Sequence, residues 1–174
     1  MKKIFVLILI STFALPSFAQ RVDFDKKLKE LGIELFVPGK PIANYVKAVR
    51  TGNLLFLAGH GPTKADGTNM LGKLGKDMTL EQGYMAARQT AVSLLSTLKA
   101  ELGDLNKLKR IVKVTGWVNC EPDFVDQPKV INGCSDLLVS VFGTKGMHAR
   151  AALGANSLPL GMPVEVEIIV ELED

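Results

Sequence analysis

Three segments of the chain repeat apolar residues at the spacing of an amphipathic helix. The longest opens with a capping box, in which Thr79 and Gln82 each satisfy a backbone amide of the other, and Gly103 follows its last apolar position. Another helix is predicted to carry Pro128 in its first turn, and a short one ends at Gly32. The predicted helices are Val22–Leu31, Thr79–Leu102 and Asp126–Val141.

Five other segments carry the β-branched or alternating pattern of strands. The first two flank the turn Thr51-Gly52-Asn53 and so predict a hairpin. The last alternates most regularly, with valine and isoleucine on one face and Glu165, Glu167 and Glu171 on the other. The predicted strands are Tyr45–Val49, Leu54–Ala58, Leu108–Val118, Ala149–Ala155 and Val164–Leu172.

After the short first helix, these elements follow one another in the order ββαβαββ. This order predicts an α+β fold, in which a mixed sheet carries the two long helices on one face. The opposite face of the sheet is then left without cover. Because large exposed apolar surfaces are rare in monomers, the pattern favours partner subunits on that face.

The N-terminal residues have the order of a secretory signal peptide. Two lysines precede an apolar run over residues 4–15, which is short for a bilayer span, and Ser17-Phe18-Ala19 resembles a cleavage site. We therefore expect residues 1–19 to be removed and residues 20–174 to form a single domain. Cleavage near Ala19 predicts export to the periplasm or the medium; an uncleaved membrane anchor is the alternative.

Charge gives little reason to expect nucleic acid as a partner. The whole sequence holds 21 basic against 18 acidic residues, and removal of the two lysines of the expected signal peptide brings the mature chain close to neutral. A near-neutral surface also gives no reason to expect the mature form to bind an anionic membrane.

The common catalytic and metal-binding motifs do not occur in the sequence. The two histidines, His60 and His148, stand in no ligand spacing with an acid or a cysteine and are interpreted as turn or surface residues. Cys120 and Cys134 are expected to be separate, partly buried thiols, with a disulfide as the alternative. No P-loop, dinucleotide fingerprint or G-x-S-x-G elbow is found, so we expect neither a metal nor a cofactor.

Arg150 is an isolated charge within a stretch of small apolar residues, and Glu165 opens the last strand after a turn. If that turn folds the strand back beside Arg150, an arginine and a carboxylate flank a dry pocket. Such a pair can hold a small carboxylate and activate a water molecule next to it. The alternative is a surface cation and a solvated strand face.

Four blocks of the sequence resemble the RidA family, also called YjgF or L-PSP-like proteins. They are Asn44–Pro62, Gly72–Asn119, Pro122–Gly143 and His148–Glu171. The resemblance implies a six-stranded sheet backed by two helices, like chorismate mutase, and a homotrimeric barrel with clefts between subunits. It also implies hydrolytic deamination of enamines and imines, of the 2-aminoacrylate or 2-iminobutanoate type, to 2-keto acids and ammonia without metal or cofactor.

The same resemblance implies roles for five residues. Arg150 is similar to the family's arginine that binds the substrate carboxylate, and Glu165 to the acid that positions or activates water. Tyr45 corresponds to a tyrosine that lines the cleft from the neighbouring subunit, and Asn132 to a helix asparagine near the cleft. The backbone at Ala152 would offer an amide or a carbonyl to the substrate. For Tyr45 and Asn132, a packed aromatic and a helix-surface amide are the alternatives.

Two residues depart from the family pattern and leave other functions open. Ala152 stands where many deaminating members have a cysteine, and His60 stands where a glutamine is common. A non-catalytic trimer that binds small carboxylates or keto acids is the alternative function. Ribonuclease activity, a label that some family members carry, is the least favoured because no catalytic pair of histidines is visible.

Overall fold

A computed structural model describes residues 22–41 and 43–173. The expected signal peptide, residues 1–19, lies outside the described residues. The helices are α1 (Phe24–Glu30), α2 (Leu80–Leu102) and α3 (Gln127–Phe142). The strands are β1 (Ala48–Thr51), β2 (Leu54–His60), β3 (Leu108–Asn119), β4 (Ala149–Ala155) and β5 (Val164–Leu172). Three short 3-10 turns, η1 (Leu105–Lys107), η2 (Gly143–Gly146) and η3 (Pro159–Gly161), complete the order.

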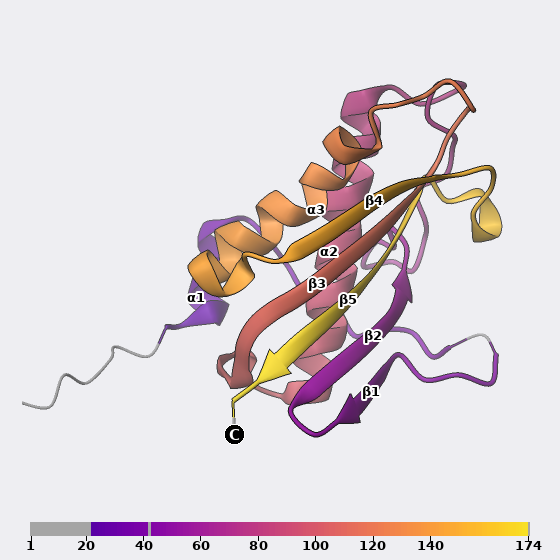
Figure 1. Ribbon diagram of the computed structural model, residues 1–174. Coiled ribbons are helices and arrows are strands. Elements are labelled where there is room, and N and C mark those ends of the chain that lie inside the picture. Colours follow the sequence, from indigo (N-terminus) through magenta and orange to yellow (C-terminus); the bar gives the residue numbers. More distant parts are fainter. Residues whose placement is uncertain (1–21, 42, 174) are drawn as a thin grey trace, which may run out of the picture.

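The strands form one mixed sheet in the order β1-β2-β5-β3-β4, in which only the β3–β4 pair is parallel. Helices α2 and α3 lie side by side against one face of this sheet (Figure 1). The α+β fold, the hairpin of β1 and β2 and the placement of both long helices are therefore confirmed.

The sixth strand implied by the resemblance is not found in the described residues, whose sheet has five strands. Between β2 and α2 the chain forms only isolated bridges, such as the one that joins Thr63 to Asn69. Gly67, Gly72 and Gly75 in this segment adopt positive φ angles, which interrupt the extended backbone that a strand requires.

Local signals explain where the long helices begin and end. Thr79 and Gln82 form the predicted capping box at the start of α2, and Gly103, with φ at 70°, follows its end. The first helix differs from the prediction in its buried face. Phe24 and Leu28 point into the core, whereas Val22, the first residue of the predicted helix, precedes the observed one and is exposed.

Helices α2 and α3 approach closely at Gly133. A Cβ atom added to this residue would overlap the backbone carbonyl of Tyr84 on α2, which cannot move aside as a flexible side chain can. The close approach buries the apolar faces of both helices against each other and against the sheet.

We expect Gly133→Ala to lower the free energy of unfolding by about 1–3 kcal/mol, because the two helix backbones must separate to accept the methyl group. Urea denaturation measures the change. Gly39→Ala is the matched control, since a Cβ atom at Gly39 meets no atom within 4 Å. Equal stability of the two variants would show that the helices do not pack as described.

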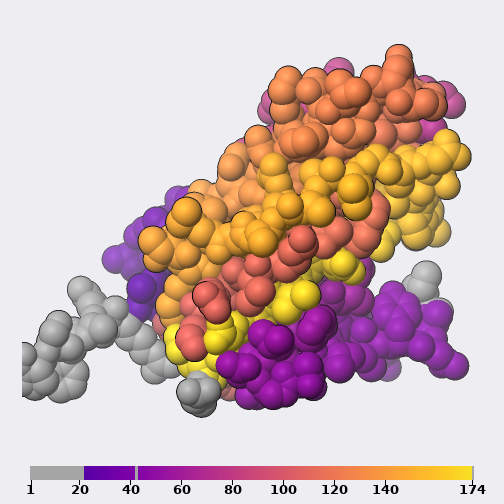
Figure 2. Space-filling view, in the orientation of Figure 1, coloured from indigo at the N-terminus to yellow at the C-terminus, as the bar shows by residue number. Residues whose placement is uncertain are grey.

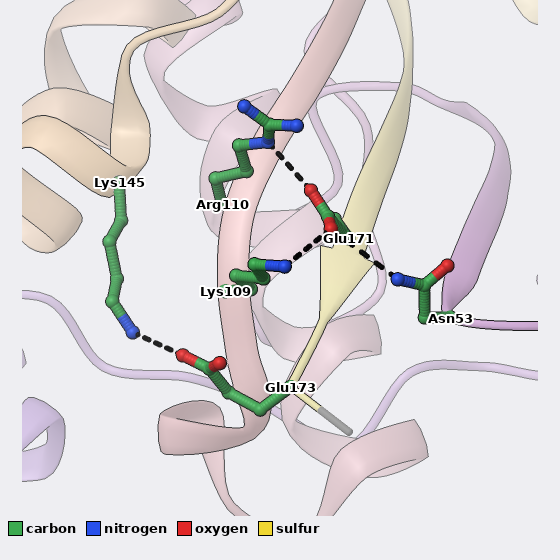
Figure 3. A network of polar contacts seen from close by, with 6 residues as sticks. All are labelled: Asn53, Lys109, Arg110, Lys145, Glu171 and Glu173. Carbon is green, nitrogen blue, oxygen red and sulfur yellow. Dashed lines mark hydrogen bonds and ion pairs between the residues drawn. The ribbon is translucent and has the colours of Figure 1, made fainter.

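At the end of β5 that lies away from Glu165, Glu171 is held by a network of cations (Figure 3). Its carboxylate accepts hydrogen bonds from Lys109 Nζ at 2.8 Å, Arg110 Nε at 2.7 Å and Asn53 Nδ2 at 3.4 Å. Lys109 and Arg110 are consecutive, and an irregularity of the β3–β5 register at this point lets both reach one carboxylate. Glu171 therefore has a largely buried side chain, not the solvated one that the alternation predicted.

The hydrogen bond from Lys109 is the main reason why the pKa of Glu171 lies below its usual value of 4.5. A carboxyl group whose pKa is lowered by folding stabilises the fold above its unfolded pKa, and this contribution is lost as the pH falls through the folded pKa. We expect Glu171→Gln to lower the urea midpoint at pH 7, with the difference from wild type shrinking below pH 4.5. Glu30→Gln, which alters an exposed pair with Lys26, should change little at either pH. A constant difference across the pH range would contradict the network.

The face of the sheet opposite the helices carries exposed apolar side chains. Val49 on β1, Phe56 on β2 and Leu153 on β4 are 55%, 40% and 47% exposed. Figure 2 shows the strands from β4 to β1 side by side at this surface, with no described helix in front of them. The described residues thus leave uncovered the face that the sequence predicted to be bare.

Candidate functional site

Arg150 lies on β4, an edge strand, and its side chain reaches over to α3. Its Nη1 donates hydrogen bonds to Asn132 Oδ1 at 2.8 Å and to Ser135 Oγ at 3.0 Å. Its Nη2 is 3.5 Å from the carbonyl oxygen of Pro128. The guanidinium is therefore fixed by one helix, although Asn132 and Arg150 are 18 positions apart in the sequence.

One edge of the Arg150 guanidinium is open. Asn132 and Ser135 use both hydrogens of Nη1, and among the described residues Nε has no acceptor. Nε–H and the adjacent Nη2–H point in parallel from the guanidinium, which is the arrangement that binds both oxygens of a carboxylate. Arg150 is thus held from one side and can bind a carboxylate with the other.

Ala152 belongs to the same part of the structure. It follows Arg150 by two positions on β4, so its side chain lies on the same face, and it is half-buried against the core. Because β4 is an edge strand, some of its backbone amides and carbonyls face away from β3 and can meet a ligand.

Glu165 lies elsewhere, on the face of the sheet without helices. It pairs with Trp117 of β3, whereas its neighbour Val166 is fully buried beneath the helices. Its carboxylate lies against Gly59 of β2, where any side chain would overlap it. Partial burial is the main reason why the pKa of Glu165 is raised, and the nearby charge of Glu167 raises it further.

A cavity of about 750 Å³ contains this carboxylate. Tyr45, which is 49% exposed, lines it together with Glu165 and Gly59. Lys47 also lines it, and desolvation lowers the pKa of this lysine. A different, apolar cavity of about 800 Å³ between α1 and α2 holds neither Arg150 nor Glu165.

The structure does not bring Arg150 and Glu165 together within one chain. The prediction that a turn places their strands side by side is wrong, because β5 pairs with β2 and β3, and β3 separates it from β4. The two side chains also lie on opposite faces, since Arg150 pairs with Val114, which is buried under the helices, and Glu165 pairs with Trp117 on the other face.

The predicted residues therefore form two groups. We call Arg150, Asn132, Ser135 and Ala152 the arginine half-site, and Glu165, Gly59 and Tyr45 the glutamate half-site. The sequence analysis missed Ser135, which stands three positions after Asn132 on α3 and so shares its helix face. It missed Gly59 as well, because only the packed structure shows what a side chain there would meet.

Both histidines differ from their interpretation as turn or surface residues. His60 is buried, with Nδ1 at 2.7 Å from the carbonyl of Ala58 and Nε2 at 2.8 Å from Thr97 Oγ1 on α2. Burial is the main reason why its pKa is lowered. His148 is half-buried beside the arginine half-site, where its Nε2 is 3.0 Å from Ser135 Oγ.

The cysteines are buried and separate. Cys120 and Cys134 form no disulfide, and full burial raises the pKa of Cys134 to about 12 although Arg150 acts in the opposite direction. Across residues 22–41 and 43–173, histidine, cysteine, aspartate and glutamate side chains form no group of three suited to a metal ion. No helix in the same part of the chain has the length and apolar character needed to cross a membrane.

Comparisons with known proteins place this geometry in context. Residues 25–172 match the protein family described as "YjgF/chorismate mutase-like, putative endoribonuclease". The chain is 44% identical to Protein TCP17 of Trypanosoma cruzi over 148 residues, which cover 84% of this chain and 92% of that protein.

Two solved structures are also similar. The crystal structure of Atu1372 from Agrobacterium tumefaciens, a protein of unknown function, has a TM-score of 0.81 and 42% identity, and the match covers 86% of this chain and 92% of that one. RidA from a Psychrobacter species has a TM-score of 0.55 and 22% identity over 78% of this chain and 94% of that one, a likeness of fold alone.

Proposed function

The chain belongs to the YjgF/chorismate mutase-like family, and we propose that it acts as a homotrimeric deaminase of small enamines and imines. The substrates are imino acids of the 2-iminobutanoate type, and the products are 2-keto acids and ammonia. The active site forms where the arginine half-site of one subunit meets the glutamate half-site of the next.

The observation that carries this proposal is the separation of the two half-sites. Each half-site is well formed within the chain, yet Arg150 and Glu165 lie on opposite faces of one sheet. Glu165 and the exposed Val49 and Phe56 share the uncovered face, while Arg150 lies at the β4 edge. If the β4 edge of one copy packs against the uncovered sheet face of the next, Arg150 of the first copy meets Glu165 of the second. Rotational symmetry then repeats this contact around a closed ring.

In the assembled cleft, the open edge of Arg150 binds both oxygens of the substrate carboxylate and so fixes the orientation of the adjacent C=N bond. Glu165 accepts a proton from a water molecule as the water oxygen bonds to the imine carbon, and the C=N π electrons move to nitrogen, which takes up a proton from solvent. Glu165 then returns its proton to the amine nitrogen. As the C–N bond breaks and ammonia leaves, a lone pair of the hydroxyl oxygen forms the C=O bond of the keto acid and the hydroxyl proton passes to solvent, which restores the proton taken from it. The raised pKa of Glu165 suits both transfers.

Imine hydrolysis by purified residues 20–174 tests the proposal. An amino-acid oxidase generates 2-iminobutanoate in place, and the loss of trapped imine is followed with wild type, Arg150→Ala and Arg88→Ala. Arg88 lies on α2 and belongs to neither half-site, so it controls for the loss of an arginine as such. Acceleration that requires Arg150 but not Arg88 supports the deaminase, and no acceleration by a folded trimer contradicts it.

A binding protein without catalysis is the second candidate, and one observation favours it. Asn132 and Ser135 of the same chain already fix the guanidinium of Arg150, so carboxylate binding does not depend on Glu165. Binding of 2-ketobutyrate without imine turnover would establish this function. Ribonuclease activity is less well supported, because His60 is buried and both of its ring nitrogens are already hydrogen-bonded.

A further inference from the structure

A chain of hydrogen bonds connects Arg150 to His148. Arg150 Nη1 donates to Ser135 Oγ at 3.0 Å, Ser135 Oγ lies 3.0 Å from His148 Nε2, and His148 Nδ1 lies 2.7 Å from the carbonyl oxygen of Gly146. The residues come from three elements, α3, η2 and the start of β4. Ser135 has so far only held the guanidinium of Arg150, and His148 has no role yet in the proposed chemistry.

The partners fix the direction of each hydrogen bond when His148 is neutral. A carbonyl oxygen only accepts, so Nδ1 carries the proton and donates to Gly146. Nε2 then has a free lone pair and accepts the hydroxyl proton of Ser135. The Ser135 oxygen in turn accepts from Arg150, so the Ser135 hydroxyl and both ring nitrogens of His148 are satisfied.

Protonated His148 can keep the same contacts. Nε2–H then donates to Ser135 Oγ, whose two lone pairs accept from Arg150 and His148 together. The hydroxyl proton of Ser135 turns to the helix carbonyl four residues earlier, as serines in helices commonly do. The cost of this state is electrostatic, since two cations then lie on either side of one hydroxyl oxygen.

Arg150 is the charged group that acts on His148. Burial comes first in lowering the pKa of His148, and the positive charge of Arg150 lowers it further, against the effect of the hydrogen bond to Gly146. The other ionisable groups nearby have partners or are neutral. Cys134 on α3 is a neutral thiol, Asp136 accepts from the hydroxyl of Tyr84 and Lys145 on η2 pairs with Glu173.

We propose that Ser135 and His148 belong to the carboxylate-binding group and that His148 takes up a proton when Arg150 binds a carboxylate. The bound anion offsets the charge of Arg150, so the protonated imidazole is opposed less than in the free protein. Linkage is reciprocal, and carboxylate affinity therefore increases as the pH falls through the transition of His148. This inference rests on the proposed function only for the identity of the ligand.

Histidine NMR tests the coupling without any ligand. The chain has two histidines, His60 and His148, so their ring signals are simple to assign. Arg150→Ala should raise the pKa of His148, because it removes a neighbouring cation. The signal of His60, which contacts Ala58 and Thr97, should not change. An unchanged pKa of His148 would overturn the inference, whatever the enzymatic activity.

Calorimetry with 2-ketobutyrate tests the linkage itself. Titrations in buffers of different ionisation enthalpy measure proton uptake near the pKa of His148. Wild type should take up a fraction of one proton per site, and His148→Gln, which keeps the hydrogen-bonding capacity without titrating, should take up less. Glu165→Gln should retain this uptake, which separates it from titration in the glutamate half-site.

The two proposals fail in different ways. If 2-ketobutyrate does not bind while Arg150→Ala still shifts the pKa of His148, the coupling stands and the ligand class is wrong. If 2-ketobutyrate binds with equal proton uptake in wild type and His148→Gln, the carboxylate site stands and the role of His148 is overturned.

Discussion

Replacing Arg150 with alanine is expected to lower kcat/KM for 2-iminobutanoate by about 100- to 1000-fold, because a two-point, charge-assisted grip on the carboxylate is lost. The same change should abolish measurable binding of 2-ketobutyrate. Steady-state kinetics and calorimetry give the two values. Asn132 and Ser135 leave one edge of the guanidinium open for the ligand. The substitution should therefore remove ligand binding without preventing assembly of the trimer.

Arg150→Lys refines this result. Lysine keeps the positive charge but lacks the planar fork, so its kcat/KM should lie between those of wild type and the alanine variant. Arg88→Ala should behave as wild type, since Arg88 on α2 belongs to neither half-site. Wild-type kinetics in Arg150→Ala, with the trimer intact, would remove this residue from the site.

Replacing Glu165 with glutamine is expected to lower kcat by about 100-fold or more, since amide oxygen and nitrogen cannot take up and return a proton. Binding of 2-ketobutyrate should change much less, because Arg150 makes the main contact. In wild type, kcat/KM should fall in acid as Glu165 becomes protonated, with an apparent pKa above the ordinary 4.5 because burial raises it. If Glu165→Gln no longer shows this fall of kcat/KM in acid, the titrating group is Glu165. An unchanged kcat would exclude Glu165 as the proton carrier.

Gly59→Ala tests the role of Glu165 without replacing Glu165 itself. Its methyl group would overlap the carboxylate of Glu165 and displace it while leaving the acid in place. We therefore expect a fall in kcat with little change in 2-ketobutyrate binding. Gly39 lines the same cavity, but its methyl group would meet no atom within 4 Å, so Gly39→Ala should lower kcat much less.

Sequence patterns predicted most of the fold because their causes are local. The capping box at Thr79 and the regular alternation of β5 depend on residues a few positions apart. Strand β5 has the predicted limits, and α2 differs only in that Thr79 caps the helix and Leu80 begins it. The start of β1 at Ala48 and the extension of β2 to His60 were not predicted. A register shift between Leu57 and His60 turns the histidine toward α2, and no local pattern marks such a bulge.

The site could be predicted only in its parts. The sequence pattern and the resemblance both pointed to Arg150 and Glu165, and in the structure α3 holds Arg150 by hydrogen bonds while Glu165 is partly buried. Their relation within the chain could not be inferred, because it depends on β3 lying between β4 and β5, a contact between distant segments. Ser135 was missed and His148 was interpreted as a turn or surface residue for the same reason, since the helix and the edge strand meet only in the folded protein.

Mixed assembly of two inactive variants tests the central claim most directly. Arg150→Ala and Glu165→Gln chains are unfolded, refolded together in equal amounts and assayed for 2-iminobutanoate hydrolysis. If each site combines an arginine from one subunit with a glutamate from the next, about a quarter of the sites should regain both residues, with a matching share of wild-type activity. The double variant refolded with itself should stay inactive. An inactive mixture, from subunits shown to have exchanged, would contradict a site built between subunits.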